Sequence, residues 1–158
     1  RYRYPDSKLY IMGVSQDKMT SFTFVDETYD VRNIPEDIII DHAFECVGGL
    51  GSTKAISQII DYIRPEGTIA ILGVSENPVP INTRMILEKG LRMFGSSRSG
   101  RTDFINTVDM FKEHPEIVEH LKNIVGDVVD VRNVDDMHTA FEKDIAKAGG
   151  KTIMLWNV

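Results

Sequence analysis

The sequence of 158 residues contains one cysteine, no long hydrophobic run and no cluster of basic residues. The single cysteine, Cys46, excludes an internal disulfide and a zinc site built from several cysteines. We expect Cys46 to be a small buried core residue in a reducing, cytoplasmic setting. The apolar runs are only as long as a strand and no signal peptide is visible, so we expect no membrane partner. A net charge of −6 without a basic run also argues against nucleic acid as a partner.

What the sequence does have is a series of apolar segments that each end in glycine. Amphipathic helical patterns separate them, one after Ser52, a plausible N-cap, and one between Asn82 and Gly90. Strands that alternate with helices predict an α/β fold with a doubly wound, Rossmann-like parallel sheet, whose ligand site lies along the carboxyl edge. The predicted strands are residues 9–12 before Gly13, 38–47 before Gly48, 68–72 before Gly73 and 91–94 before Gly95.

The segment RPEG at residues 64–67 precedes the most apolar of these strands. Pro65 fixes its own backbone and Gly67 permits a positive φ, so we expect a turn between a helix and a strand. At the other end of the strand, Gly73 removes the side chain, which lets a flat ligand approach the backbone. Further on, the pattern predicts helices at 102–114, 115–124 and after Asn133, and strands at 126–131 and 152–156.

The start of the chain does not look like the start of a nucleotide-binding fold. It has no initiator methionine, and its first residues resemble the end of a helix that leads into the strand at Leu9. We therefore expect a fragment that lacks the first strand and the glycine-rich phosphate loop. The cluster at residues 48–51, GGLG, does not match the spaced three-glycine pattern, and a phosphate cradle and a simple turn both stay open there. The missing strand belongs between those at Leu9 and Ile38, so something must fill that gap or the sheet must rearrange.

The tip of the first predicted strand bears on cofactor choice. NAD-binding folds usually place an acidic residue there to accept hydrogen bonds from the ribose hydroxyls, but this sequence has Gly13. Ser15 can donate a hydrogen bond to a 2′-phosphate and Lys18 can supply positive charge. NADP is therefore preferred and NAD remains possible. In the alternative interpretation, Ser15 caps a short helix and Lys18 is a solvated surface charge.

Several of these segments occur together in one known family. The run DHAFECVG at 41–48, the RPEG turn, Gly73 with Val74, and the stretch from Gly90 to Ser97 have the order and spacing of the medium-chain zinc-dependent alcohol dehydrogenases. The sequence resembles that family over nearly its whole length. The resemblance implies a hydride transfer between a nicotinamide cofactor and an alcohol or carbonyl compound. It also divides the chain into a nucleotide-binding domain, residues 1–125, and a C-terminal segment, residues 126–158, that would pack on a catalytic domain.

The same resemblance implies roles for individual residues. They fall into a ribose-discriminating tip, a segment beside the adenosine, a stretch whose carbonyls hold the nicotinamide carboxamide, and a loop whose amide completes that contact. In that order, the residues are Gly13, Ser15 and Lys18; Cys46, Val47 and Gly48; Leu72, Gly73 and Val74; and Ser97, Arg98 and Ser99.

The family's catalytic zinc is held by an amino-terminal half that this sequence lacks, so the fragment alone is predicted to be inactive. The run at 72–79 is similar to members that act on a phosphorylated sugar, ribitol 5-phosphate or ribulose 5-phosphate. Arg98 and Arg101 could meet a substrate phosphate, or Arg101 could pair with Asp103 or face water.

We expect a homodimer through the edge strand that begins at Leu91 and ends at Ser97, unless Arg92 and Arg98 blunt that edge. A different class of function also stays open. The chain could be a non-catalytic nucleotide-binding or dimerisation module.

Overall fold

The computed structural model describes residues 3–146 and 149–157, and the chain forms two compact units. The first unit comprises Arg1–Ile34 together with Arg101–Val158, and the second comprises Pro35–Gly100. The predicted boundary between residues 125 and 126 concerns packing on a further domain and stays a prediction. No helix in the described residues is long and apolar enough to cross a membrane.

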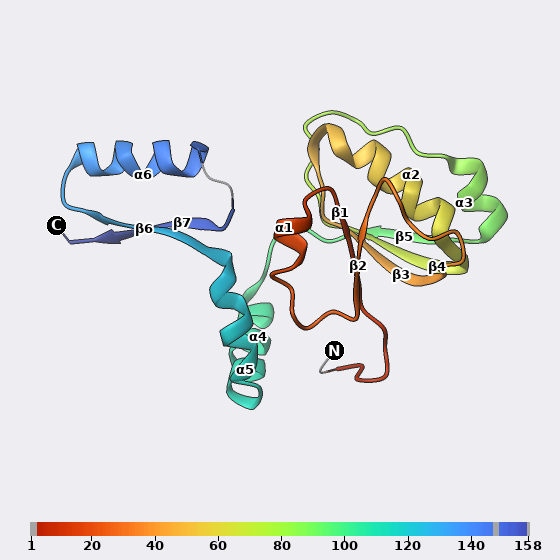
Figure 1. The fold of residues 1–158 in the computed structure, drawn as a ribbon, viewed down its shortest axis with the longest axis horizontal. Coiled ribbons are helices and arrows are strands. Elements are labelled where there is room, and N and C mark those ends of the chain that lie inside the picture. Colours follow the sequence, from red (N-terminus) through yellow and green to blue (C-terminus); the bar gives the residue numbers. More distant parts are fainter. Residues whose placement is uncertain (1–2, 147–148, 158) are drawn as a thin grey trace. The chain divides into compact units, whose positions relative to one another are not determined.

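The second unit is a three-stranded parallel sheet with helices on one face (Figure 1). The strand order is β3-β4-β5, and both pairings are parallel. In chain order its elements are β3 (Ile40–Glu45), the 3-10 turn η1 (Gly49–Gly51), α2 (Ser52–Tyr62), β4 (Ile63–Ile71), α3 (Thr83–Lys89) and β5 (Arg92–Gly95).

The core of this unit forms where α2 and α3 cover the sheet (Figure 1). Apolar residues recur along α2 at helical spacing, which gives the helix one face that packs on the strands. The buried cluster consists of Ile56, Ile60, Ile63, Ile69 and Leu91. Both helices were predicted, and so were the ends of α3. Asn82 Oδ1 accepts a hydrogen bond from Met85 N at 3.1 Å, and Gly90 has the left-handed φ of 61°.

The RPEG segment differs from its prediction. The β3–β4 ladder passes from the pair Ile40–Ile63 to the pair His42–Thr68, so residues 64–67 bulge out of the pairing inside β4 instead of forming a turn before it. The positive φ, 62°, belongs to Glu66 and not to Gly67. Gly67 is needed for space, because a Cβ there would lie 2.5 Å from Ile63 Cγ1 and 2.9 Å from the carbonyl oxygen of Arg64.

The first unit contains two further parallel pairs of strands, β1 with β2 and β6 with β7. Helix α6 packs on β6 and β7, with Val129, Val131 and Ala140 buried between them (Figure 1). The predicted cap is confirmed, since Asn133 Oδ1 accepts a hydrogen bond from Asp136 N at 3.0 Å. The elements are β1 (Tyr10–Gly13), α1 (Gln16–Met19), β2 (Glu27–Asp30), α4 (Arg101–Glu113), α5 (Glu116–Leu121), η2 (Lys122–Ile124), β6 (Val125–Val131), α6 (Val134–Ala146) and β7 (Lys151–Trp156).

The predicted fold class is confirmed, with one difference in how the strands are grouped. Every strand pairing is parallel, and strands alternate with helices along the chain. The strands form three separate sheets instead of one, and among the described residues no strand pairs with both β1 and β3.

Candidate functional site

The carboxyl ends of β3, β4 and β5 form one edge of the sheet in the second unit. Glu45, Ile71 and Gly95, the last residues of the three strands, are paired in register. Three groups of predicted site residues follow these strand ends and therefore come to the same edge. They are Cys46, Val47 and Gly48 after β3; Leu72, Gly73 and Val74 after β4; and Ser97, Arg98 and Ser99 after β5.

The segments that follow β3 and β4 are hydrogen-bonded to each other. The amide of Gly49 donates to the carbonyl oxygen of Val74 at 2.8 Å, and the hydroxyl of Ser75 donates to the carbonyl oxygen of Gly49 at 3.2 Å. Gly48 has a φ of 69°, and a Cβ there would lie 2.7 Å from the carbonyl oxygen of Val74. Residue 48 must therefore be glycine for its backbone conformation and for space.

Gly73 is equally constrained. A Cβ on Gly73 would overlap the amide nitrogen of Gly48 and would lie 2.5 Å from Glu45 Oε2. The predicted approach of a flat ligand to Gly73 stays a prediction, because the space beside this residue is filled by Gly48 and Glu45. The missing side chain lets the ends of β3 and β4 approach each other.

Glu45 is the residue at this edge that the sequence analysis missed. Its side chain is only 1% exposed, and both carboxylate oxygens accept hydrogen bonds. Oε1 accepts from the amides of Val47 at 2.9 Å and Gly48 at 3.0 Å and from the Ser52 hydroxyl at 2.9 Å, and Oε2 accepts from the amide of Gly73 at 3.2 Å. The available signal was an acidic residue inside an apolar strand, immediately before a pair of glycines. Ser52, expected as an N-cap, makes no capping bond and binds Glu45 instead.

The hydrogen bonds to Glu45 determine its ionisation. Burial by itself raises the pKa of a carboxyl group, but the bonds from the Gly48 amide, the Ser52 hydroxyl and the amides of Val47 and Gly73 outweigh it. The pKa of Glu45 is therefore lowered below its ordinary value, and the buried side chain is a carboxylate at neutral pH. A buried negative charge at this position stabilises the closely spaced N–H groups around it.

The backbone groups after β4 are used unequally. The amides of Leu72 and Gly73 both donate to the main-chain carbonyl oxygen of Glu45 at 2.9 Å. Within residues 3–146 and 149–157, no hydrogen bond reaches the carbonyl oxygens of Leu72 and Gly73. This edge can therefore offer acceptors to a ligand that carries an N–H donor, such as a carboxamide.

Cys46 was expected to be buried, and this is wrong: it is exposed. Successive side chains on a strand point to opposite faces, so the burial of Glu45 brings Cys46 to the outside. Partial desolvation and then the neighbouring Glu45 carboxylate raise the pKa of the Cys46 thiol. The thiol is thus protonated at neutral pH, and it is not a reactive thiolate.

The loop after β5 carries the third predicted group. The amide of Ser96 donates to the carbonyl oxygen of Ile71 at 3.2 Å, which attaches the start of the loop to β4. Arg98 has a φ of 67°, a conformation that costs about 1 kcal/mol for a residue with a side chain. The carboxamide contact of this loop and the contact of Arg98 with a substrate phosphate stay predictions.

The remaining predicted residues, Gly13, Ser15 and Lys18, lie in the first unit. Strand β1 ends at Gly13. Ser15 is the N-cap residue of the short helix α1 but makes no side-chain capping bond, and Lys18 is exposed, so the alternative interpretation stays open. The structure also reveals a carboxylate that the sequence analysis did not consider, because Asp30 on β2 is paired in register with Gly13.

Asp30 is neutralised locally by Arg32. The main-chain amide and the Nε of Arg32 each donate to Asp30 Oδ1 at 2.8 Å, and its Nη2 pairs with Oδ2. The side-chain hydrogen bond of Arg32 and then its main-chain bond lower the pKa of Asp30 to about 2. The residue opposite Gly13 is therefore one half of an ion pair and not an unpaired acidic acceptor.

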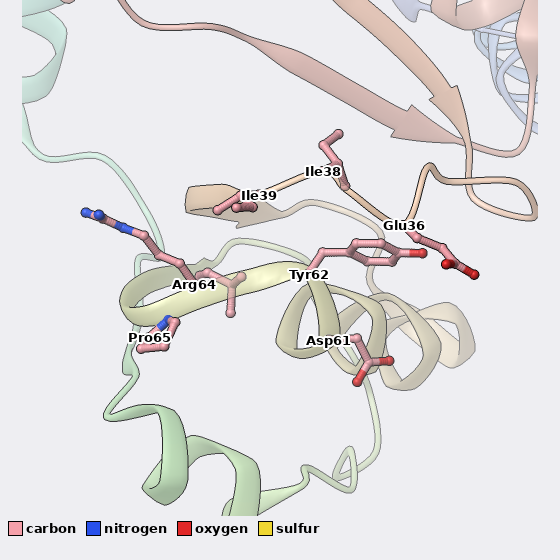
Figure 2. Close-up of a pocket in the computed structure, with 8 residues that line it drawn as sticks. Glu36, Ile38, Ile39, Asp61, Tyr62, Arg64 and Pro65 are labelled. Carbon is pink, nitrogen blue, oxygen red and sulfur yellow. The ribbon is translucent and has the colours of Figure 1, made fainter.

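Two surface depressions lie elsewhere. One, of about 370 Å³, lies at the opposite edge of the sheet in the second unit, beside the start of β4 (Figure 2). Its lining includes the apolar side chains of Ile38 and Ile39, the carboxylates of Glu36 and Asp61 and the guanidinium of Arg64. The other, of about 350 Å³, lies in the first unit and includes Asp17 and Lys18 in its lining. Neither depression is lined by the residues at the carboxyl edge of β3 and β4.

The fold and this edge together define a nucleotide-binding α/β domain of the Rossmann type. Residues 21–113 match the family model described as zinc-binding dehydrogenase. Since the match spans more than half of the sequence, the chain belongs to the zinc-binding dehydrogenase family. The predicted family resemblance is confirmed.

Named relatives match over almost the entire chain. A ribulose-5-phosphate reductase of Bacillus spizizenii is 51% identical over 156 residues, which are 99% of this chain and 46% of the relative. Ribulose-5-phosphate reductase 1 of Staphylococcus aureus is 49% identical, again over 99% of this chain and 46% of the relative. The chain thus spans about half the length of the relatives that it matches.

Solved structures give the same result. The crystal structure of S. aureus TarJ in complex with NADPH matches with a TM-score of 0.98 at 49% identity and covers 100% of this chain and 50% of that one. L-idonate 5-dehydrogenase from Escherichia coli matches with a TM-score of 0.74 at 14% identity, and at that identity the likeness shows the fold alone.

The zinc of the family name does not fit the residues that this structure describes. Within residues 3–146 and 149–157, no three histidine, cysteine, aspartate or glutamate side chains are grouped so that they could hold a metal ion. His42 and Cys46 lie on or just after β3 and have no such partners. The nicotinamide cofactor is compatible with this edge, since the carbonyl oxygens of Leu72 and Gly73 accept no hydrogen bond from the described residues.

Proposed function

We propose that this chain is the cofactor-binding part of a longer reductase that transfers a hydride from NADPH to ribulose 5-phosphate. The product would be ribitol 5-phosphate. The observation that carries the proposal is the edge formed by the ends of β3 and β4, where two glycines bring the strand ends together and leave carbonyl acceptors on Leu72 and Gly73. Relatives that are 49–51% identical over this chain carry the name ribulose-5-phosphate reductase, which supports the substrate.

In this proposal the residues of the chain bind and orient the cofactor. When bound, the reduced nicotinamide supplies the hydride. The carbonyls of Leu72 and Gly73 accept hydrogen bonds from the carboxamide, which fixes the ring in one orientation and so decides which face of the ring meets the substrate. The absence of a side chain at Gly73 lets the ends of β3 and β4 come together, which holds these carbonyls at the edge.

The preference for NADPH over NADH rests on the tip in the first unit. Ser15 offers a hydroxyl and Lys18 an ammonium for a 2′-phosphate, and Arg32 offsets the charge of Asp30. An unpaired carboxylate at this place would favour the ribose hydroxyls of NADH instead. The NADPH complex of the S. aureus relative supports this choice.

Zinc and the residues that hold it belong, in this proposal, to parts of the protein outside the described residues. We therefore expect that the chain alone binds the cofactor at most and does not catalyse the reaction. In this proposal the protein works in the reducing cytoplasm, which suits the one cysteine of this chain.

A homodimer through β5 is part of the same proposal. Strand β5 lies at the end of the order β3-β4-β5, so one side of its backbone is not paired by any described strand. The edge strand of a parallel sheet can pair with the same strand of a second copy of the chain across a twofold axis. Phe94 on β5 is 52% exposed and would be covered there.

The direct test is an assay of the full-length protein with NADPH and ribulose 5-phosphate, followed by the loss of the near-ultraviolet absorbance of the reduced nicotinamide. We expect oxidation of NADPH that requires the sugar phosphate, with ribitol 5-phosphate as the product. Binding of NADPH without any oxidation would favour a non-catalytic nucleotide-binding module. Failure to bind NADPH or NADH at all would contradict the proposal.

A further inference from the structure

We propose that Glu45 is a positioning residue that orients the carbonyl groups at the cofactor edge toward the nicotinamide carboxamide. The inference rests on the proposed function and names a residue within it. Glu45 does not touch the cofactor in this proposal. It acts through the peptide groups that follow β3 and β4.

The Glu45 carboxylate is surrounded by hydrogen-bond donors. Glu45 is 1% exposed, and its two oxygens accept bonds from the amides of Val47, Gly48 and Gly73 and from the hydroxyl of Ser52. An ionised carboxylate only accepts hydrogen bonds, so every neighbouring N–H group turns toward it. Three of the four donors are main-chain amides at the edge.

The geometry of the peptide bond relates the direction of each of these amides to that of a carbonyl group. In a trans peptide the N–H and the preceding C=O point in opposite directions, and no cis peptide occurs in the described residues. When the amide of Gly73 turns toward Glu45, the carbonyl of Leu72 must turn away from it. In the same way, the bonds from Val47 and Gly48 direct the carbonyls of Cys46 and Val47 away from Glu45.

One of these carbonyls is available to the ligand. The carbonyl of Leu72 is one of the two after β4 that receive no hydrogen bond within the described part of the chain. The Gly73 amide is shared between the main-chain oxygen of Glu45 at 2.9 Å and its Oε2 at 3.2 Å. Side chain and main chain of Glu45 thus hold the same peptide group, which makes the direction of the Leu72 carbonyl depend on the carboxylate.

Replacing the carboxylate by an amide would change this arrangement. In Glu45→Gln, an –NH₂ group faces at least one amide N–H, and two donors repel each other. The Leu72–Gly73 peptide then loses its bond to the side chain and keeps only the main-chain bond to Glu45, so it tilts and the acceptor for the carboxamide is misdirected. If the role of Glu45 were purely structural, Glu45→Gln would instead weaken the binding of all cofactors alike.

The experiment compares two reduced cofactors on the full-length protein. One is NADPH, and the other is its 3-acetylpyridine analogue, which keeps the ring carbonyl but has a methyl group where the carboxamide has –NH₂. We expect the wild type to bind NADPH about tenfold more tightly than the analogue, as one hydrogen bond allows. In Glu45→Gln this ratio should fall to about one. Glu66→Gln, the same change at an exposed residue of β4, should keep the wild-type ratio.

Each outcome is informative. If Glu45→Gln still binds NADPH about tenfold more tightly than the analogue, the positioning role is overturned while the proposed function stands. If the wild type binds neither cofactor, the proposed function fails and the inference with it. If Glu45→Gln does not fold, Glu45→Asp, which keeps the charge but withdraws it from the Gly73 amide, replaces it and should give an intermediate ratio. An unchanged ratio in a folded Glu45→Asp would equally overturn the inference.

Discussion

The amide of Gly73 donates to two oxygens of Glu45, the main-chain carbonyl at 2.9 Å and the carboxylate Oε2 at 3.2 Å. This shared bond joins the end of β4 to the end of β3 at the edge where the proposed nicotinamide site lies. Because the carboxylate is buried and negatively charged, both the stability of the protein and its response to pH should depend on it.

Glu45→Gln should lower the free energy of unfolding by about 2–4 kcal/mol at neutral pH, because it removes charge-assisted bonds from a buried site. Since the pKa of Glu45 is lowered in the folded state, its stabilisation is present above the unfolded-state pKa and is lost as the pH falls through the folded-state pKa. Urea unfolding of the full-length protein at about pH 7 and about pH 4 measures both effects. The wild type should lose more stability than the variant on acidification, and equal losses would contradict the ionised state of Glu45.

Gly73→Ala should raise the Kd for NADPH by about tenfold or more, because the new Cβ would overlap the amide of Gly48 and approach the Glu45 carboxylate. Fluorescence titration of the full-length protein measures this. Gly95→Ala is the matched control, since a Cβ at the tip of β5 meets nothing closer than the carbonyl oxygen of Ile71 at 3.9 Å. Similar effects of the two substitutions would show that the spacing of the β3 and β4 ends does not govern binding.

Lys18→Ala should weaken NADPH binding by about tenfold and leave NADH binding nearly unchanged, because the ammonium is proposed to contact only the 2′-phosphate. Lys54→Ala removes an exposed ammonium from α2 and serves as the control for a general loss of positive charge. Titrations of each variant with NADPH and with NADH measure the two dissociation constants. If the two cofactors weaken equally in Lys18→Ala, the contact with the 2′-phosphate is ruled out.

Arg32→Ala tests the ion pair at the same tip. With a pKa of about 2, Asp30 is ionised throughout the neutral range, and without Arg32 its charge would be left uncompensated beside Gly13. We expect the ratio of NADH to NADPH affinity to rise, because the carboxylate repels a 2′-phosphate and accepts hydrogen bonds from ribose hydroxyls. An unchanged ratio would mean that Asp30 lies too far from the ribose to matter.

Lys89→Met should destabilise the protein by about 1–3 kcal/mol. The Lys89 ammonium donates to the carbonyl oxygens of Ile60 at 2.5 Å, Ile63 at 2.9 Å and Asp61 at 3.0 Å, and so caps the C-terminus of α2 with a positive charge. Arg84→Met, which breaks only an exposed pair with Glu88, should cost less than about 0.5 kcal/mol. Thermal unfolding of both variants provides the comparison, and equal costs would contradict the capping role.

The regular elements could be predicted from the sequence because their patterns are local. The apolar stripe of α2, the Asn82 cap of α3 and the apolar strand before Gly73 each follow from a few neighbouring residues. Strand β2 was not predicted, since Glu27–Asp30 is short and polar and forms only by pairing with β1. The bulge at residues 64–67 likewise depends on pairing with β3.

The site was predictable in outline and not in its supporting residue. Glycines at strand ends pointed to the carboxyl edge. The buried carboxylate of Glu45 is held by amides from the ends of two strands. One of these amides, that of Gly73, is 28 positions away in the sequence, so no local pattern reveals the contact. The wrong expectation for Cys46 has the same origin, since adjacent strand residues cannot both face inward.

The central claim is that the end of β4 holds the nicotinamide, and a crystal structure of the full-length protein with NADPH tests it most directly. We expect the carboxamide nitrogen at about 2.7–3.2 Å from the carbonyl oxygen of Leu72 or Gly73. A nicotinamide ring bound away from these carbonyls, for example in the depression beside Ile39 and Tyr62, would contradict the account.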